Sequence, residues 1–361
     1  MGYPLLEIHH QPIYQNAVAI RRYCAAQGVS VCAVIKGFHA HPSIVRTQVA
    51  AGFSMLGSAS LPHLAAVKAE GYAVETLALR IPMLSELPEL VRVADISLNS
   101  EWVTLQALDR EAARQEKVHH VILMRDLGDL REGVFDSAAF RALAEKVENT
   151  MPHLHLRGIG VNLTCYGSVI PTRENLSVLV ADARAIEERI GRRLEIVSGG
   201  STSSLPLLQR GELPEGINHL RVGEGLIVPC DLLDYWQCRI PGLSNHTLIL
   251  KGEVVEAARK PTMPVGEKGR DALGNVKQYR DLGWRKRVLL AMGVFDFGDC
   301  DKLIPCDPSI QILGASSDHL ILDVENCSCD YQVGDVLAFE MHYKAMLFAT
   351  ANPLVDKRDM D

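Results

Sequence analysis

Residues 31–39 read Val31-Cys-Ala-Val-Ile-Lys-Gly-Phe-His39, and the interpretation of the whole chain depends on this stretch. Five apolar residues run directly into Lys36, and Gly37 follows. A continuous apolar run rich in β-branched residues predicts a fully buried strand. At the end of such a strand, desolvation favours the neutral amine, which is a nucleophile able to form a Schiff base with an aldehyde. The alternative for a lone lysine is a strand-end side chain that points into solvent.

Similar strands recur along the chain and alternate with amphipathic segments, such as residues 100–115 and 173–190. Alternating strands and helices predict parallel strands joined by right-handed crossovers. Eight strands in roughly 220 residues are typical of an α/β fold of the closed (β/α)8 TIM-barrel type. An open, doubly wound sheet is the alternative, but no GxGxxG follows the first strand. The strands are expected near residues 31–36, 54–57, 75–80, 94–98, 119–125, 156–162, 194–197 and 218–222.

The pattern changes from about residue 235. Strands are expected there without intervening helices, and a turn-rich loop at residues 261–283 interrupts them. We therefore expect two domains: a cofactor-binding barrel at residues 1–232 and a C-terminal all-β domain at residues 233–361.

Composition narrows the function classes. The chain has 361 residues, of which 47% are hydrophobic and 22% charged, a soluble globular balance. A net charge of -7 without a basic cluster argues against nucleic-acid binding. No apolar run approaches the ~20 residues needed to span a bilayer, and the N-terminus lacks the features of a secretion signal. The nine scattered cysteines indicate a reducing, cytoplasmic environment, and their spacing predicts no metal site.

The carboxyl ends of barrel strands carry the functional residues of such enzymes. After the seventh strand, Ser198-Gly-Gly-Ser-Thr-Ser-Ser204 offers two glycines and several hydroxyl groups, which predicts a phosphate cradle; a flexible surface loop is the alternative. A phosphate site and Lys36 on one barrel rim suggest pyridoxal phosphate. Arg221 would leave the pyridine nitrogen of that cofactor unprotonated, which suits simple proton exchange; an ordinary salt bridge is its alternative role.

These blocks resemble a known family, the fold-type III pyridoxal-phosphate racemases of the alanine racemase-like group, and within it the ornithine racemase branch. The resemblance extends from about Ser30 to Phe348. It rests on ordered blocks that include AVIK, LRIPML, ADISLNSE, DLGDLREG, GIGVNLTCYG, IVSGGSTSS, LRVGE, RKRVLLAMG and ILGASSDHLILD.

The resemblance implies a role for each matching residue. Lys36 would be the Schiff-base lysine and the proton carrier on one face of the substrate. Arg131 would contact the phenolic oxygen of the cofactor, Asn162 would pack against its ring where alanine racemase has a histidine, and Arg221 would contact the pyridine nitrogen. The phosphate group would be held by Ser201, Thr202, Gly223, Glu224 and Tyr343.

Two departures from alanine racemase concern proton transfer. The tyrosine that serves as its second base, donated by the partner subunit, is replaced by Val294, and a modified lysine is replaced by Met124. The candidates for the second base are Asp318 and His319, in a segment that resembles the one inserted into the neighbouring subunit. Cys165 and Tyr166 are the next candidates.

The resulting hypothesis is a homodimeric amino-acid racemase with shared active sites and a basic substrate, ornithine or lysine. Two-base exchange is required because inversion needs proton delivery from the opposite face. Alanine or serine is an alternative substrate. A decarboxylase of basic amino acids is the alternative enzyme, and a pyridoxal-phosphate homeostasis protein is the non-enzymatic alternative.

Overall fold

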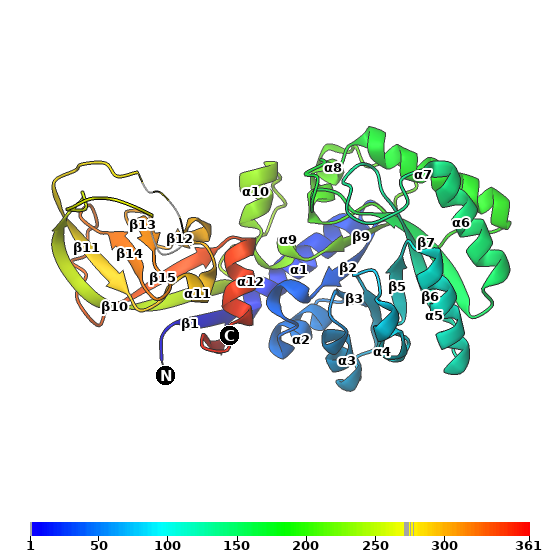
Figure 1. The fold of residues 1–361 in the computed structure, drawn as a ribbon, viewed down its shortest axis with the longest axis horizontal. Helices are drawn as coiled ribbons and strands as arrows, with labels where there is room; N and C mark the ends of the chain where they lie inside the picture. Colours follow the sequence, from blue (N-terminus) through cyan, green and yellow to red (C-terminus); the bar gives the residue numbers. More distant parts are fainter. Residues whose placement is uncertain (1, 271–273, 275, 277) are drawn as a thin grey trace. The chain divides into compact units, whose positions relative to one another are not determined.

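The computed structural model describes residues 2–270, 274, 276 and 278–361. The chain forms two compact units (Figure 1). One contains residues Ile13–Lys36 and Pro42–Leu243, and the other contains Met1–Pro12, Gly37–His41 and Ser244–Asp361. The division near residue 243 lies beyond the predicted boundary at residue 232. The N-terminal segment up to Pro12 also belongs to the second unit, whereas the predicted domain bounds place it in the barrel.

The first unit is a closed barrel of eight parallel strands, as the alternating pattern predicted. Each strand pairs with the next one in the chain, and the last pairs with the first through the register of Val31 with Leu220. The strands are β2 (Ser30–Val34), β3 (Met55–Ser58), β4 (Glu75–Ala78), β5 (Ile96–Asn99), β6 (His119–Arg125), β7 (Leu154–Val161), β8 (Ile196–Ser198) and β9 (His219–Val222).

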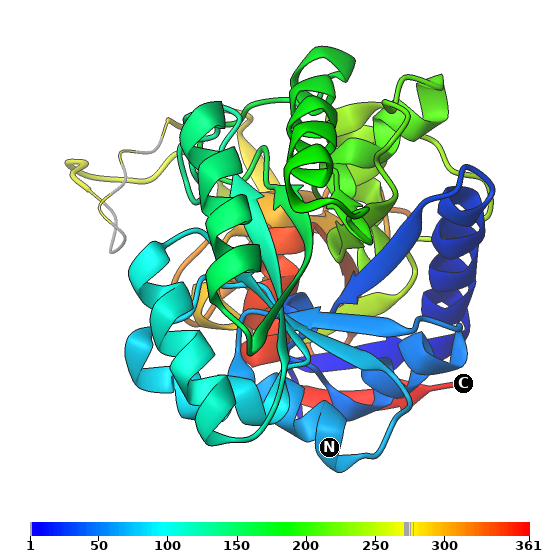
Figure 2. The ribbon, with the colours of Figure 1, turned by 90° about the vertical axis from the view of Figure 1, so that its right-hand side faces the viewer.

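Helices surround these strands, as Figure 2 shows. One apolar core lies between strands and helices and includes Leu105, Phe140 and Leu176. A second core fills the inside of the barrel and includes Cys32, Ile96 and Met124. The helices of the unit are α1 (His10–Ala25), α2 (Pro42–Ala50), α3 (Leu61–Ala69), α4 (Leu87–Val93), α5 (Trp102–Arg114), α6 (Ser137–Thr150), α7 (Arg173–Ile190), α8 (Leu205–Arg210), α9 (Glu224–Ile227) and α10 (Cys230–Trp236).

Helix α7 illustrates how the local sequence sets element bounds. Thr172 caps its N-terminus by accepting a hydrogen bond from the backbone N–H of Asn175, whose side chain reciprocates. Gly191 ends the helix in the left-handed conformation at φ 73°, which glycine adopts without steric cost. The helix therefore begins and ends where the sequence predicted.

The second unit is built on an antiparallel sheet in which the order is β12-β15-β10-β11-β14-β13. Its long strand β10 also pairs with β1, and β1 pairs with β16 in parallel. The strands are β1 (Leu5–His9), β10 (Leu248–Pro261), β11 (Trp284–Leu290), β12 (Leu303–Pro305), β13 (Gln311–Ala315), β14 (Leu320–Asp323), β15 (Val336–Met341) and β16 (Asp356–Met360).

This unit differs from the predicted all-β domain because it contains two helices. The short helix α11 (Val294–Phe297) follows β11, and α12 (Tyr343–Ala351) follows β15. The sequence pattern predicts a strand over residues 335–343, whereas Tyr343 begins α12 in the structure. Part of the expected loop at residues 261–283 lies outside the described residues. In the part of the chain that is described, no helix is long and apolar enough to cross a membrane.

Candidate active site

Lys36 lies at the carboxyl end of β2, immediately after the buried Ile35, and begins a short 3-10 turn, Lys36–Phe38. The strand is buried as predicted, whereas the lysine side chain itself is exposed at the mouth of the barrel. Even so, desolvation by the surrounding protein lowers the pKa of Lys36 from its usual value. The nearby charges of Cys165 and Glu132 oppose that shift, and those of Arg131 and Arg221 reinforce it. The amine is thus easier to deprotonate than an ordinary lysine.

Arg131 and Glu132 follow β6 and form a two-pronged ion pair. Both Arg131 Nε and Nη2 donate to the carboxylate of Glu132, the latter at 2.5 Å. This hydrogen-bonded pairing raises the pKa of Arg131. Because Glu132 also acts on the Lys36 ammonium, the pair lies within electrostatic reach of the amine. The structure therefore places Arg131 within electrostatic reach of Lys36, and its contact with the cofactor stays a prediction.

Asp129, in the same loop, is a structural clamp that the sequence did not reveal. Its side chain is buried and accepts hydrogen bonds from the backbone N–H groups of Thr164 (2.9 Å), Tyr166 (3.0 Å) and Val169 (3.3 Å). These residues form the loop after β7, where Thr164 has a positive φ of 69°. Asp129 thus fixes the loop that carries Cys165. A signal for it would have required knowing that the two loops are neighbours.

Asn162 begins that loop directly after β7. Its Nδ2 atom is buried and has no hydrogen-bond partner among the described residues. A buried amide without a partner costs free energy unless another group completes it. This open donor is what a site built for a bound molecule would contain.

The predicted phosphate cradle lies between the loops after β8 and β9. Gly200 has φ 108°, and a Cβ atom there would come within 2.8 Å of Ser204 Oγ, so only glycine fits. Ser201 Oγ lies 3.2 Å from Ser203 Oγ, and the Thr202 hydroxyl accepts a bond from the N–H of Gly225 at 3.4 Å. The two loops therefore form one connected surface of hydroxyl and backbone groups.

Gly223 and Glu224 continue this surface at the end of β9. A Cβ atom on Gly223 would lie 3.0 Å from Val34 Cβ, so the glycine permits close approach of β2. Burial, followed by the neighbouring Asp231, raises the pKa of the Glu224 carboxyl to about 8. At neutral pH this side chain is therefore mostly uncharged, and it does not repel an anion bound at the adjacent backbone.

Arg221 is buried inside the barrel near its mouth. Its Nη1 donates to Ser198 Oγ at 2.5 Å and its Nη2 donates to the carbonyl oxygen of Val161 at 2.7 Å. Burial lowers its pKa from the usual value, and the charges of Cys32, Glu132 and Cys165 offset part of that effect. Among the described residues Arg221 has no carboxylate partner, so it is available for a neutral or electron-rich group.

Three predicted site residues belong to the other unit. Asp318 and His319 are exposed at the turn between β13 and β14, where His319 N donates to Ser316 Oγ at 3.1 Å. Tyr343 packs against Gly37, because a Cβ atom there would lie 3.1 Å from its ring. The roles of these three residues in the site stay predictions.

The turn that carries Asp318 packs against the segment that lacks the expected tyrosine. Val294 N donates to Ser316 O at 2.9 Å and Phe295 N donates to Ser317 O at 3.2 Å. Burial, and secondarily the charge of Asp318, raises the pKa of Asp296 in the same segment. Asp318 therefore neighbours the place where alanine racemase has its second base.

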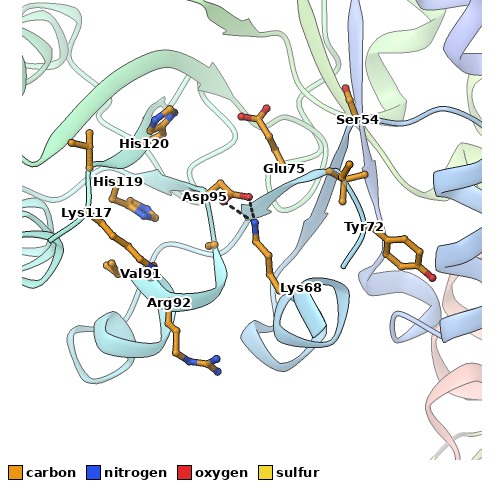
Figure 3. A pocket seen from close by; sticks show the side chains of 14 residues that line it. Ser54, Lys68, Tyr72, Glu75, Val91, Arg92, Asp95, Lys117, His119 and His120 are labelled. Carbon is orange, nitrogen blue, oxygen red and sulfur yellow. Dashed lines mark hydrogen bonds and ion pairs between the residues drawn. The ribbon is translucent and has the colours of Figure 1, made fainter. Parts of the chain in front are cut away.

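A separate cavity of about 810 Å³ lies at the opposite, amino-terminal ends of β4, β5 and β6 (Figure 3). Its charged groups are already paired: Lys68 donates to both oxygens of Asp95 at 2.8 and 2.6 Å, and Lys117 donates to Val91 O at 3.0 Å. None of the predicted site residues lines it. In this fold the amino-terminal face serves stability, so this cavity is not the active-site candidate.

The fold and the site define a class: a (β/α)8-barrel enzyme built around a lysine with a lowered pKa, with an arginine in the barrel interior and an anion cradle on the rim. The groups fit pyridoxal phosphate, since an amine, a buried arginine, a glycine-lined cradle and an open amide donor lie at the carboxyl ends of strands β2, β9, β8 and β7.

Comparison with known proteins agrees with this class. The model of the alanine racemase N-terminal domain matches residues 8–229. The chain is 40% identical over 355 residues to the ornithine racemase of Acetoanaerobium sticklandii, covering 98% of this chain and 99% of that protein. It is 36% identical over 357 residues to the lysine racemase of Thermotoga maritima, covering 99% and 98% respectively.

Solved structures show the same fold at low identity. Alanine racemase from Streptomyces lavendulae superposes with a TM-score of 0.75 at 14% identity, covering all of this chain and 98% of that one. D-threo-3-hydroxyaspartate dehydratase from Delftia sp. HT23 gives a TM-score of 0.73 at 17% identity, covering 100% and 95%. The chain belongs to the alanine racemase family, and the predicted fold and family are confirmed.

Proposed function

We propose that this protein is a pyridoxal-phosphate-dependent racemase of basic amino acids. The observation that carries the proposal is Lys36 at the end of β2, with its lowered pKa and its electrostatic neighbours Arg131 and Arg221. The similarity over nearly the whole chain to an ornithine racemase and a lysine racemase supports it.

Pyridoxal phosphate, when bound, supplies an electron-withdrawing ring that acidifies the α-proton of an attached amino acid. In this proposal Lys36 holds the cofactor in the resting enzyme and carries a proton at Nζ on one face of the substrate. Ser201, Thr202 and the backbone of Gly223 and Glu224 hold the phosphate group. Arg131, Asn162 and Arg221 orient the ring. Tyr343 is the remaining phosphate contact.

The second face requires its own proton carrier. Asp318 and His319 are the candidates, because both are exposed and Asp318 lies beside the segment in which Val294 replaces the expected tyrosine. Since these residues belong to the β unit, we propose that they act in the active site of a second copy of the chain. The exposed Phe295 side chain, at 72%, is an apolar surface next to this turn that a second subunit could cover.

Selection of a basic side chain needs a carboxylate that is not held by backbone N–H groups. Asp126 accepts bonds from Gly128 N and Leu130 N, and Asp129 clamps the loop after β7. Glu132 remains on the barrel rim near Lys36, although it shares its charge with Arg131. We propose that Glu132 attracts the distal amine of the substrate, and that Asp318 does so where His319 is the second proton carrier.

We further propose a cytoplasmic location, since the nine cysteines are free thiols.

The test begins with the absorption spectrum of purified protein incubated with pyridoxal phosphate. A visible band should appear, and borohydride reduction should add the cofactor mass to the peptide containing Lys36. Chiral chromatography should then show D-ornithine or D-lysine forming from the L-isomer, without release of carbon dioxide. Release of carbon dioxide would favour the decarboxylase, and cofactor binding without turnover would favour the homeostasis protein. A protein that binds no cofactor would refute the proposal.

A further inference from the structure

Arg221 belongs to a buried chain of three polar side chains. Arg221 Nη1 lies 2.5 Å from Ser198 Oγ, and Ser198 Oγ lies 2.9 Å from His219 Nδ1. Their relative exposures are 5% for Arg221, 0% for Ser198 and 2% for His219. No bulk water competes for these hydrogen bonds, so each partner strongly constrains the next.

The register between strands β8 and β9 places these three side chains next to one another. Ser198 on β8 is directly paired with His219 on β9, and Arg221 lies two residues further along β9. Residues two apart on a strand face the same side, so His219 and Arg221 both face the barrel interior. On β7, Gly160 leaves the necessary space: a Cβ atom there would lie 3.2 Å from Ser198 Cβ and 3.4 Å from Arg221 Nη1.

Counting protons fixes the direction of the hydrogen bond between Arg221 and Ser198. Among the described contacts, Ser198 Oγ has two partners, the Arg221 guanidinium and the His219 imidazole. Arginine can only donate, so Ser198 Oγ accepts from Arg221. The hydrogen bond between Ser198 Oγ and His219 Nδ1 forms with either tautomer of a neutral imidazole, and His219 Nε2 is buried without a partner among the described residues. Burial, together with the charge of Arg221, lowers the pKa of His219 to about 3, which agrees with a neutral ring.

The same barrel contains a matched pair that does not involve Arg221. His119 Nε2 lies 2.8 Å from Ser97 Oγ, and this hydroxyl accepts a bond from Asn99 Nδ2 at 2.9 Å. Ser97 and His119 are both buried, at 0% and 2% exposure. Ser97 and His119 have the same side chains and similar burial as Ser198 and His219, but the hydroxyl of Ser97 accepts from the neutral amide of Asn99 and not from an arginine.

We propose that Ser198 and His219 are positioning residues that hold the Arg221 guanidinium in a single orientation for the cofactor. Two of the five N–H donors of Arg221 are bound to Ser198 and Val161, which fixes the plane of the guanidinium and leaves other donors for the bound ring. A neutral His219 shares a hydrogen bond with Ser198 without adding a second positive charge beside Arg221. The inference rests on the proposed function, because it assigns Arg221 to the cofactor.

The experiment compares Ser198→Ala and His219→Ala with Ser97→Ala as the matched control. In His219→Asn the side-chain amide offers both an acceptor oxygen and an NH2 donor in place of Nδ1, so this variant serves as the conservative rescue. Two readouts are used on the full chain. The first is the side-chain Nε–H NMR signal of Arg221 in protein without cofactor, assigned by its loss in Arg221→Lys. The second is kcat and KM of the cofactor-loaded enzyme, with thermal unfolding as the check on folding.

We expect Ser198→Ala and His219→Ala to broaden or shift the Arg221 signal and to lower kcat about ten- to a hundredfold, since a hydrogen bond to a charged group is lost. KM should change little, His219→Asn should recover part of the loss, and Ser97→Ala should change neither readout. A folded Ser198→Ala variant with an unchanged Arg221 signal and unchanged kcat would overturn the inference. If wild-type protein shows no racemase activity but the NMR signal responds as expected, the proposed function fails and the positioning of Arg221 stands.

Discussion

Replacing Asp129 with asparagine tests the clamp that holds the loop after β7. The wild-type carboxylate accepts three backbone hydrogen bonds, through Oδ1 from Thr164 and Val169 and through Oδ2 from Tyr166. Asparagine keeps one oxygen and places an NH2 group where the other stood, so at least one backbone N–H faces a donor. Losing one bond to a charged acceptor and leaving a buried donor unsatisfied costs about 2–4 kcal/mol.

Equilibrium urea unfolding measures this cost. We expect Asp129→Asn to lower the free energy of unfolding by that amount and to make the loop around Tyr166 more sensitive to limited proteolysis. Asp136→Asn is the matched control, because Asp136 caps α6 from an exposed position by accepting one bond from Ala139 N at 2.7 Å, and asparagine caps helices equally well. If Asp129→Asn unfolded at the same urea concentration as wild type, with the same dependence of the unfolding free energy on urea, the stabilising role of Asp129 would be refuted.

Four further predictions follow from the structure. Lys36→Ala should abolish both the visible absorption band and amino-acid racemisation while the fold persists; residual racemisation near the wild-type rate would exclude Lys36 as the proton carrier. Asp182→Ala should lower the free energy of unfolding by about 3–5 kcal/mol in urea titrations, because it leaves the buried Arg125, at 3.0 Å, without its ion-pair partner; a loss below about 1 kcal/mol would contradict this. Burial and the neighbouring His120 lower the pKa of His119 to about 4. The His119 ring is therefore protonated near pH 6.5 in the unfolded chain, but only near pH 4 in the folded chain. The free energy of unfolding should therefore fall as the pH is lowered from about 6.5 to about 4. His119→Asn should reduce the slope of this free energy against pH by up to about 1.4 kcal/mol per pH unit; an unchanged slope would mean that His119 is protonated in the folded state. Gly158→Ala should prevent folding, judged by circular dichroism, because its Cβ would lie 2.0 Å from the backbone oxygen of Ile196; a native spectrum would show that β7 and β8 can move apart.

The sequence was sufficient to predict the barrel because its strands are short, continuously apolar runs between amphipathic helices. The carboxyl ends of the runs also pointed to the rim residues Lys36 and Arg221 without knowledge of contacts, whereas Arg131 was predicted from the family resemblance. Both inferences depend on local sequence patterns. In a parallel barrel each strand pairs with the next one in the chain, so the local patterns are nearly enough to give the topology.

Other features depend on contacts between distant residues. Strand β1 pairs with β10 and β16, more than two hundred residues away, so its local pattern did not reveal to which unit it belongs. The Asp129 clamp and the Ser198–His219 pair likewise join separate loops or strands. Helix α12 was missed because its apolar residues continue the run of β15, and a short apolar segment does not distinguish strand from helix.

The position of β1 has a consequence for synthesis on the ribosome. This strand is made before the barrel, yet its partners β10 and β16 begin at Leu248 and Asp356. At a synthesis rate of about 5–20 residues per second, β1 waits roughly 10–50 seconds for its first partner. During that time its backbone N–H and C=O groups are open to pairing with other chains. The barrel can fold while β1 waits, so the sheet of the second unit closes around a strand that has been present from the start.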